Sequence, residues 1–316
     1  MASLVIHGGA GTIPRNSFTP ESYQVARDGL RDALRVGWAI LRAGGLALDA
    51  VEAAVVALEN HPSFNAGHGA VLNAAGEHEL DAAIMDGRER RAGAIASARA
   101  IRNPVKAARR VMEASDCVLL SAAGADAFAR EQGLDMVEQS YFTTALRQQH
   151  WLRADEEKAG KLLRPRTEAE KHGTVGAAAC DDAGNLAAAT STGGYTYKRA
   201  GRVGDAPIIG AGTYADNGVV AVSCTGAGEY FIRRSTAHDI AARIRYRGDD
   251  VATAAQGAID DLTSDQCGAG LIAVDSQGKI AMPHNTEGMY RGTVTSDGAL
   301  SVGIYADDFA FVEQIA

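Results

Sequence analysis

The sequence predicts a layered α/β protein that folds as one domain. Runs that favour strands alternate with runs that favour helices along the 316 residues, and no internal repeat is present. Hydrophobic residues make up 46% of the chain and charged residues 22%, which is typical of a globular protein with a large core. Strands, then helices, then strands again indicate helical layers that pack on sheets.

The first half of the chain predicts four helices and four strands. Apolar residues recur at helical spacing over 20–43, before Gly44 and Gly45, and again over 47–58. Two further helices are predicted from 103 to about 112 and over 122–131. Short apolar runs predict strands at 4–6, 79–86, 92–96 and 117–120. The glycine-rich run 7–11 predicts a turn, and it lacks the Walker and GxGxxG patterns of a phosphate-binding loop.

Charge density rises and apolar periodicity fades from about 148 to 171. This composition predicts a solvated, mobile linker over about 148–173. Thr174 then opens an apolar run that predicts a central strand over 175–180, with a turn at 181–185 and a returning strand from 186. Further on, we expect a strand at 219–224, helices at 229–246 and 251–262, and a hairpin at 270–282.

Charge and cysteine usage exclude several classes of partner. The net charge is −8, the pI is near 5.5 and no long basic run occurs, so nucleic acid and anionic membranes are not expected partners. Arginines in 229–246 are expected to face solvent or another subunit. No secretory signal or membrane span is predicted, so we expect a cytoplasmic protein. Cys117, Cys180, Cys224 and Cys267 show no CxxC spacing and are expected to be buried and reduced.

The junction between Gly173 and Thr174 suggests self-cleavage. A threonine hydroxyl is a weak nucleophile that needs a nearby base. An α-amino group has a pKa of about 7.7–8.0, so a threonine at a chain terminus holds both hydroxyl and base. The peptide bond before Thr174 must break to create that terminus, and glycine accepts a strained backbone at this position. On these two residues alone, a glycine turn before an ordinary strand is the preferred interpretation.

Further motifs favour self-cleavage over an ordinary glycine turn. The predicted hairpin returns Thr192 toward Thr174, and the runs Gly-Arg-Val-Gly-Asp-Ala-Pro (201–207) and Ser-Cys-Thr-Gly-Ala-Gly-Glu (223–229) follow. Together with His-Gly-Gly-Ala-Gly at 7–11, they make the chain resemble the plant-type asparaginase and isoaspartyl peptidase family of N-terminal nucleophile (Ntn) hydrolases. The resemblance covers nearly the whole chain except the linker.

The resemblance implies a four-layer αββα sandwich. It also implies self-cleavage into an α subunit, 1–173, and a β subunit, 174–316, with two such units forming an (αβ)2 dimer. The implied activity is hydrolysis of isoaspartyl (β-aspartyl) dipeptides and L-asparagine with release of L-aspartate. Two alternatives remain open from the sequence: a glycosylasparaginase-type amidase, and an uncleaved protein that binds an amino acid.

The resemblance also assigns expected roles to individual residues. Thr174 would be the nucleophile and Thr192 would polarise its hydroxyl, while Thr225 and the N–H of Gly226 would form the oxyanion hole. Arg202 would bind the substrate α-carboxylate and Asp205 its α-ammonium group. Other residues would line the pocket or contact the nucleophile's amine: Val203, Gly204, Ala227, Gly228 and Asn65. Without the resemblance, Thr192 is an ordinary strand residue, Asn65 a turn residue, and Arg202 with Asp205 a surface ion pair.

The segment 58–69 contains His61 and His68, which could suggest a metal pair. Their spacing fits no helix face and no third ligand is evident, so a solvated loop is the preferred interpretation. No catalytic cofactor is expected. In the resembling family, this loop binds a monovalent cation such as sodium through backbone carbonyls. By position, these would belong to Leu58, Glu59, His61, Phe64, Ala66 and His68.

Overall fold

The computed structural model describes residues 1–159 and 173–315, and within these ranges it contains two β-sheets and surrounding helices. The large sheet has nine strands in the described residues, in the order β13-β12-β11-β1-β5-β6-β2-β3-β4. Its strands are β1 (Ser3–Gly11), β2 (Leu80–Asp86), β3 (Arg91–Ala98), β4 (Leu119–Ser121), β5 (Val175–Cys180), β6 (Leu186–Thr192), β11 (Gly288–Val294), β12 (Ala299–Gly303) and β13 (Ala310–Gln314). The small sheet, in the order β10-β9-β8-β7, comprises β7 (Thr213–Asp216), β8 (Val220–Gly226), β9 (Ala269–Val274) and β10 (Ile280–Ala281).

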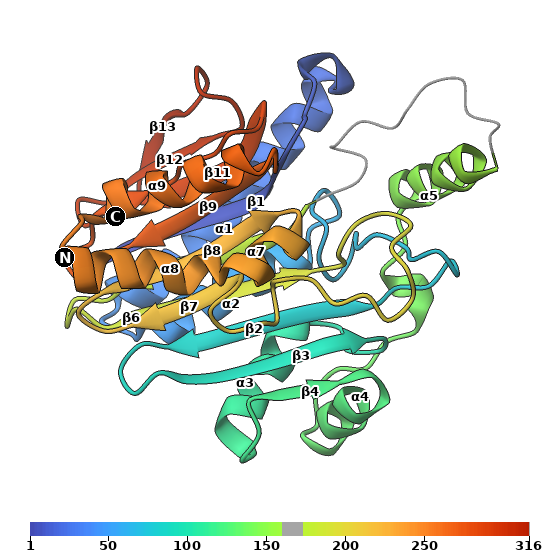
Figure 1. Cartoon of the computed structure of the whole chain (residues 1–316), viewed down its shortest axis with the longest axis horizontal. Helices are drawn as coiled ribbons and strands as arrows, with labels where there is room; N and C mark the ends of the chain where they lie inside the picture. Colours follow the sequence, from blue (N-terminus) through green and yellow to red (C-terminus); the bar gives the residue numbers. More distant parts are fainter. Residues whose placement is uncertain (160–172, 316) are drawn as a thin grey trace.

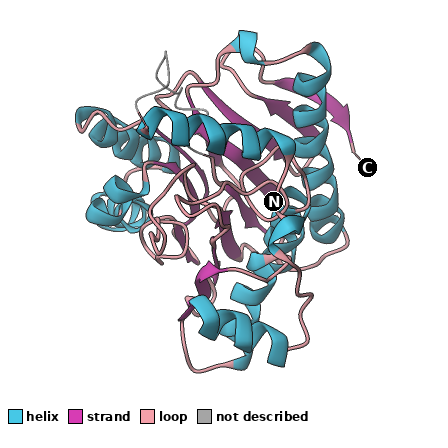
Figure 2. Cartoon of the chain, turned by 90° about the vertical axis from the view of Figure 1, so that its right-hand side faces the viewer, coloured by secondary structure: helices cyan, strands magenta, loops and turns pink. Residues whose placement is uncertain are grey.

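The helices form two outer layers, which Figure 1 shows in front of and behind the sheets. One layer packs on the large sheet and comprises α1 (Pro20–Arg42), α2 (Ala47–Glu59), α3 (Pro104–Ala114) and α4 (Ala122–Glu131). The other packs on the small sheet and comprises α7 (Gly228–Arg234), α8 (Thr236–Ala242) and α9 (Val251–Ser264). The remaining helical segments in the described residues are α5 (Ala145–Lys158), η1 (Arg15–Ser17), η2 (Gln139–Tyr141) and the π-helical η3 (Arg243–Arg247). The view in Figure 2 shows the strands enclosed between helices. The predicted αββα sandwich is confirmed.

Small residues on the central strands bring the layers together. In β5, Val175, Ala177 and Ala179 face the α1–α4 layer, and Ala178 and Cys180 face the small sheet. This is the period-two alternation of a strand with both faces covered. Thr174 lies directly before β5, in the middle of the large sheet, as the sequence predicts.

The glycine-rich run 7–11 is not a turn, contrary to the prediction. It continues β1 to Gly11 because residues Gly9 to Gly11 pair with β11. The register shifts between His7 and Gly9, and Gly9 has a φ of +112°, which glycine adopts without steric penalty. The result is a bulged strand that runs past the start of β5.

The predicted linker is helical in its first part. Helix α5 covers Ala145–Lys158, and the Thr144 side chain caps it by accepting from Arg147 N. Its charged residues are good helix formers, while Arg147 and Ala154 are buried. The rest of the predicted linker, 160–172, lies outside the described residues.

Other differences from the sequence predictions concern the helix at 229–246 and one cysteine. The helix predicted over 229–246 breaks at Ser235, which is left-handed with a φ of 50°, and ends in a π-helical segment. Most of its arginines are exposed, in line with the expectation, and several form ion pairs within the chain, including Arg234 with Asp265 and Arg243 with Asp239. The prediction of four buried cysteines is wrong for Cys117, which is exposed, and right for the other three. No helix in the described residues is long and apolar enough to span a membrane.

Candidate functional site

Thr174 and Thr192 meet where β5 begins and β6 ends. The hairpin register pairs Val175 with Ser191, which places the next residue along β6 beside Thr174. The Thr174 hydroxyl donates to Thr192 Oγ1 at 3.2 Å, and both side chains are buried. The structure therefore brings together the two threonines singled out in the sequence.

The carbonyl of Gly173 receives two hydrogen bonds. Asn65 Nδ2 donates to Gly173 O at 2.6 Å, and Thr192 Oγ1 donates to the same oxygen at 3.1 Å. The Asn65 amide is fixed in orientation because Nδ2 also donates to Gly194 O at 2.7 Å and Oδ1 accepts from Val71 N at 2.9 Å. In the uncut chain Asn65 thus contacts the carbonyl side of the Gly173–Thr174 bond.

The bulge in β1 lies against this peptide bond. A Cβ at Gly9 would lie 3.0 Å from Gly173 Cα and 3.2 Å from Thr174 N. Any larger residue would push the bond away from Asn65 and Thr192, so the approach requires glycine on steric grounds as well as for its φ. The run 7–11 therefore lies directly beside Thr174.

A buried chain of hydroxyls runs from His7 between the two sheets. His7 Nδ1 lies 2.9 Å from Thr174 O, and Nε2 lies 2.9 Å from Ser223 Oγ. Burial lowers the pKa of His7 to about 3, so the ring is neutral. Since a carbonyl only accepts, Nδ1 carries the proton and Nε2 accepts from Ser223.

The chain continues from Ser223 to Thr190 at 2.7 Å and from Thr190 to Thr213 at 2.6 Å. Thr213 Oγ1 also lies 3.0 Å from Ala206 O, the carbonyl of the residue after Asp205. The backbone of Thr174 is thereby linked to the Arg202–Asp205 segment. The sequence alone does not indicate these hydrogen-bonded contacts. One signal in the sequence is that His7 lies on the same strand face as Val5. An apolar residue would be expected at position 7, so a histidine there indicates buried hydrogen-bond partners.

Thr225 and Gly226 end strand β8 next to β1. Ala10 N donates to Thr225 Oγ1 at 3.2 Å, which leaves the hydroxyl proton of Thr225 available to another acceptor. Gly226 has a φ of +154°, and a Cβ there would lie 2.7 Å from Gly268 O. Glycine therefore allows the backbone at this position to pass close to β9.

Arg202 and Asp205 follow strand β6 and both lie next to Gly228. The Arg202 guanidinium pairs with Glu229 through Nε at 2.9 Å and Nη2 at 3.0 Å, and it stacks over the Tyr195 ring at 4.7 Å. A Cβ at Gly228 would lie 2.6 Å from Asp205 Oδ1 and 3.0 Å from Arg202 Nη2. Gly228 thus leaves space for both charged groups, and the two residues are not the surface ion pair considered from the sequence.

Asp205 has an unsatisfied carboxylate oxygen. The residue is 5% exposed, and its Oδ2 is buried without a hydrogen-bond partner among the described residues. Burial raises the pKa of Asp205 to about 7. A buried carboxylate of this kind is suited to an incoming cation such as an ammonium group.

Buried polar contacts hold the segment that carries Arg202 and Asp205. Gly204 N lies 3.5 Å from Asp81 Oδ2, and Gly201 N donates to Glu79 Oε1 at 2.9 Å. Lys198 is fully buried and donates from Nζ to Glu79 O at 2.9 Å. Val203, between Arg202 and Gly204, and Ala227, between Gly226 and Gly228, are half-buried.

The loop after α2 is mostly buried, contrary to the solvated loop preferred from the sequence. Phe64, Asn65 and Ala66 are buried, and His68 Nδ1 contacts Tyr141 O at 2.6 Å. Neither histidine belongs to a group of three or more His, Cys, Asp or Glu side chains that could hold a metal within the described ranges.

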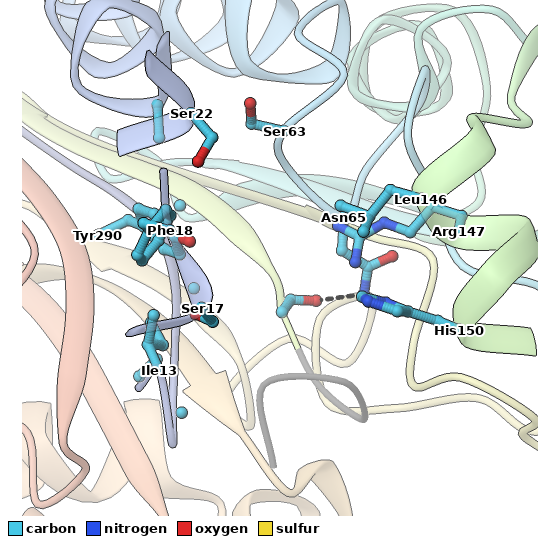
Figure 3. A pocket seen from close by; sticks show the side chains of 16 residues that line it. Ile13, Ser17, Phe18, Ser22, Ser63, Asn65, Leu146, Arg147, His150 and Tyr290 are labelled. Carbon is cyan, nitrogen blue, oxygen red and sulfur yellow. Dashed lines mark hydrogen bonds between the residues drawn. The ribbon is translucent and has the colours of Figure 1, made fainter. Parts of the chain in front are cut away.

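A cavity of about 280 Å³ adjoins Gly173 (Figure 3). Strand β1, the loop at Asn65, helix α5 and Tyr290 of β11 form its walls. Figure 3 shows Arg147 and His150 extending from α5 toward Asn65. The cavity is therefore continuous with the surroundings of the Gly173–Thr174 bond.

Comparisons with known proteins show the family of the chain. A family model described as asparaginase matches residues 1–304. The isoaspartyl peptidase of Escherichia coli (strain K12) is 46% identical over 310 residues, which cover 97% of each chain. That of Salmonella typhimurium is 46% identical over 312 residues, covering 97% of this chain and 99% of the relative. The isoaspartyl peptidase/L-asparaginase of Mus musculus is 42% identical over 302 residues, covering 95% and 90%. The chain therefore belongs to the asparaginase family, a family of N-terminal nucleophile hydrolases.

Proposed function

We propose that the chain cleaves itself between Gly173 and Thr174 and that the freed Thr174 hydrolyses isoaspartyl dipeptides and L-asparagine to L-aspartate. The carrying observation is the Gly173–Thr174 bond itself. A buried threonine hydroxyl lies beside it, and two donors, Asn65 Nδ2 and Thr192 Oγ1, point at its carbonyl oxygen.

Self-cleavage starts when Thr174 Oγ1 attacks the Gly173 carbonyl carbon. The new Oγ1–C bond replaces the C–N bond, and the hydroxyl proton passes to the nitrogen that becomes the Thr174 amine. Negative charge develops on Gly173 O, where Asn65 and Thr192 donate. Water then hydrolyses the ester and releases a Gly173 carboxylate and a free Thr174 hydroxyl. The α chain would end at residue 173 and the β chain would begin at 174.

Substrate hydrolysis reuses the same hydroxyl. The free Thr174 amine takes the hydroxyl proton as Oγ1 attacks the side-chain carbonyl carbon of the β-aspartyl group, and it returns that proton to the leaving nitrogen. Thr192 polarises the hydroxyl. Thr225, whose oxygen already accepts from Ala10 N, and the N–H of Gly226 stabilise the developing oxyanion. Water completes the reaction and releases L-aspartate.

The pocket of Arg202 and Asp205 selects the β-aspartyl group. The guanidinium binds the free α-carboxylate, and the unsatisfied Asp205 carboxylate binds the free α-ammonium group. An ordinary α-aspartyl peptide cannot present both groups because its α-carboxyl is part of the peptide bond. The half-buried Val203 and Ala227, with Gly204 and Gly228, complete the walls. The relatives' names support isoaspartyl peptidase and L-asparaginase activity rather than glycosylasparaginase activity.

We also propose that backbone carbonyls of Leu58, Glu59, His61, Phe64, Ala66 and His68 hold a structural sodium ion. Glu59 O and His61 O each accept one backbone N–H, from His68 and Phe64, which leaves each a second lone pair. A Cβ at Gly67 would lie 2.5 Å from Glu59 O, so the left-handed glycine keeps that carbonyl accessible. An (αβ)2 assembly is proposed from the family resemblance, and sedimentation analysis of the cleaved protein would test it.

The activity is tested with four substrates given to the purified, self-cleaved protein. We expect release of L-aspartate from β-aspartyl-leucine and L-asparagine, and none from α-aspartyl-leucine. Preferential turnover of a glycosylated asparagine would instead indicate the amidase alternative. Thr174→Ala should abolish both cleavage and turnover, and residual hydrolysis at the wild-type rate would refute the role of Thr174.

A further inference from the structure

The cavity beside Gly173 contains a buried cation, Arg147, that has no acidic partner among the described residues. Arg147 is 6% exposed, and its only hydrogen bond among the described residues runs from Nε to Gly69 O at 2.6 Å. Within residues 1–159 and 173–315 it forms no ion pair with a carboxylate. Burial lowers the pKa of Arg147 to about 10, so the side chain is still charged near neutral pH. A buried guanidinium in this state favours an incoming anion.

The cavity lies on the opposite side of Thr174 from the aspartyl pocket. Arg202 and Asp205 lie in the segment after β6. In this segment, Gly204 N contacts the side chain of Asp81 in β2. The cavity is bounded by β1 and by Tyr290 of β11. The order β11-β1-β5-β6-β2 therefore places Thr174, at the start of β5, between the two. A substrate whose aspartyl end lies at Arg202 and whose carbonyl carbon lies at Thr174 projects its leaving group toward this cavity.

The remaining walls suit an uncharged side chain. Ile13, Phe18 and Tyr290 give the cavity an apolar side, which Figure 3 shows across from Arg147. A second cleft near the oxyanion-hole candidates, beside Gly226 and Tyr230, is lined by uncharged residues alone among those described. That cleft therefore offers a carboxylate no cationic side chain among the described residues.

We propose that the cavity beside Gly173 binds the leaving amino acid of an isoaspartyl dipeptide and that Arg147 pairs with the free carboxylate of that amino acid. The apolar wall receives its side chain. This inference rests on the proposed function, because it names the leaving-group subsite of that same reaction. L-Asparagine, whose leaving group is ammonia, makes neither contact.

The test compares β-aspartyl-leucine with β-aspartyl-leucinamide, which keeps the leucine side chain but lacks the carboxylate. The self-cleaved wild-type protein should have a higher kcat/KM for the acid, chiefly through a lower KM. In Arg147→Met, the ratio of kcat/KM for the acid to that for the amide should fall about tenfold or more, because a charged hydrogen-bond partner is lost. Arg147→Lys should keep part of the preference.

Arg153→Met provides the matched control, since Arg153 is exposed on the same helix, and it should leave the ratio and L-asparagine turnover unchanged. Equal loss for acid and amide in Arg147→Met would overturn the proposal and indicate that Arg147 only anchors α5 to Gly69. If Arg147→Met does not fold, the wild-type pair decides alone, because equal kcat/KM values for acid and amide overturn the proposal. Failure of the proposed function is distinct, since the wild-type protein would then hydrolyse neither dipeptide nor L-asparagine.

Discussion

Replacing Asn65 with leucine should slow self-cleavage strongly. Leucine has a similar volume but no amide, so Gly173 O loses the 2.6 Å donor and keeps the 3.1 Å bond from Thr192. Gly9 still packs against the backbone of Gly173 and Thr174, since the substitution does not change β1. The variant therefore removes one of two groups that stabilise charge on the scissile carbonyl.

The size of the effect follows from comparable oxyanion-hole donors. Removal of one such donor costs about 2.7–4 kcal/mol in the transition state, or roughly 10²–10³ in rate. The fold also loses the bond from Val71 N to Asn65 Oδ1, and a buried unsatisfied N–H costs about 1–3 kcal/mol of stability. We therefore expect a folded but less stable precursor that cleaves about 100 to 1000 times more slowly.

Denaturing gels at intervals after purification of the precursor measure the cleavage rate. Asn73→Leu is the matched control, because Asn73 is fully buried and its Oδ1 accepts from Ala75 N and Glu77 N away from the scissile bond. It should lower the melting temperature by a similar amount without slowing cleavage. Cleavage of Asn65→Leu at a rate within threefold of Asn73→Leu would refute the assigned role of Asn65.

Three further predictions concern the pocket and the buried chain. The pKa of Asp205 is about 7, so its carboxyl becomes protonated at lower pH and no longer attracts the ammonium group of L-aspartate. The inhibition constant of L-aspartate should therefore rise about tenfold for each pH unit below 7. The same pH dependence in Asp205→Asn would contradict this prediction. Glu229→Gln should lower KM several-fold, because Glu229 competes with the substrate carboxylate for Arg202, and a raised KM would show that Glu229 instead orients the arginine. Ser223→Ala removes the donor to His7 Nε2 and should lower kcat more than KM; a change confined to KM would exclude positioning of Thr174 through His7.

The elements that the sequence predicts well are those with strong local signals. Helix α1 begins at Pro20 after the Thr19 cap, and β5 and β6 flank a tight turn, so their positions follow from local chemistry. Strand β1 was missed beyond Ile6 because its continuation depends on pairing with β11, which lies far away in sequence. Helix α5 was missed because Arg147 and Ala154 become buried only when the helix docks.

The site shows the same division between local and long-range information. Thr174 and Thr192 are predictable neighbours because one hairpin carries both. The contact of Asn65 with Gly173 spans more than a hundred residues, and the sequence alone suggests only a turn residue there. Arg147 is also not recognisable as a candidate from the sequence, because it lies directly before a run that predicts a solvated linker, whereas the fold buries it. Charge in a sequence indicates solvent unless long-range packing encloses it.

Intact mass spectrometry of the active protein tests the central claim most directly. We expect two chains after purification, one of them beginning at Thr174, and hydrolysis of β-aspartyl-leucine in proportion to the amount of that chain. A single species of 32.9 kDa with full activity would contradict the claim that the free amine of Thr174 is needed for catalysis.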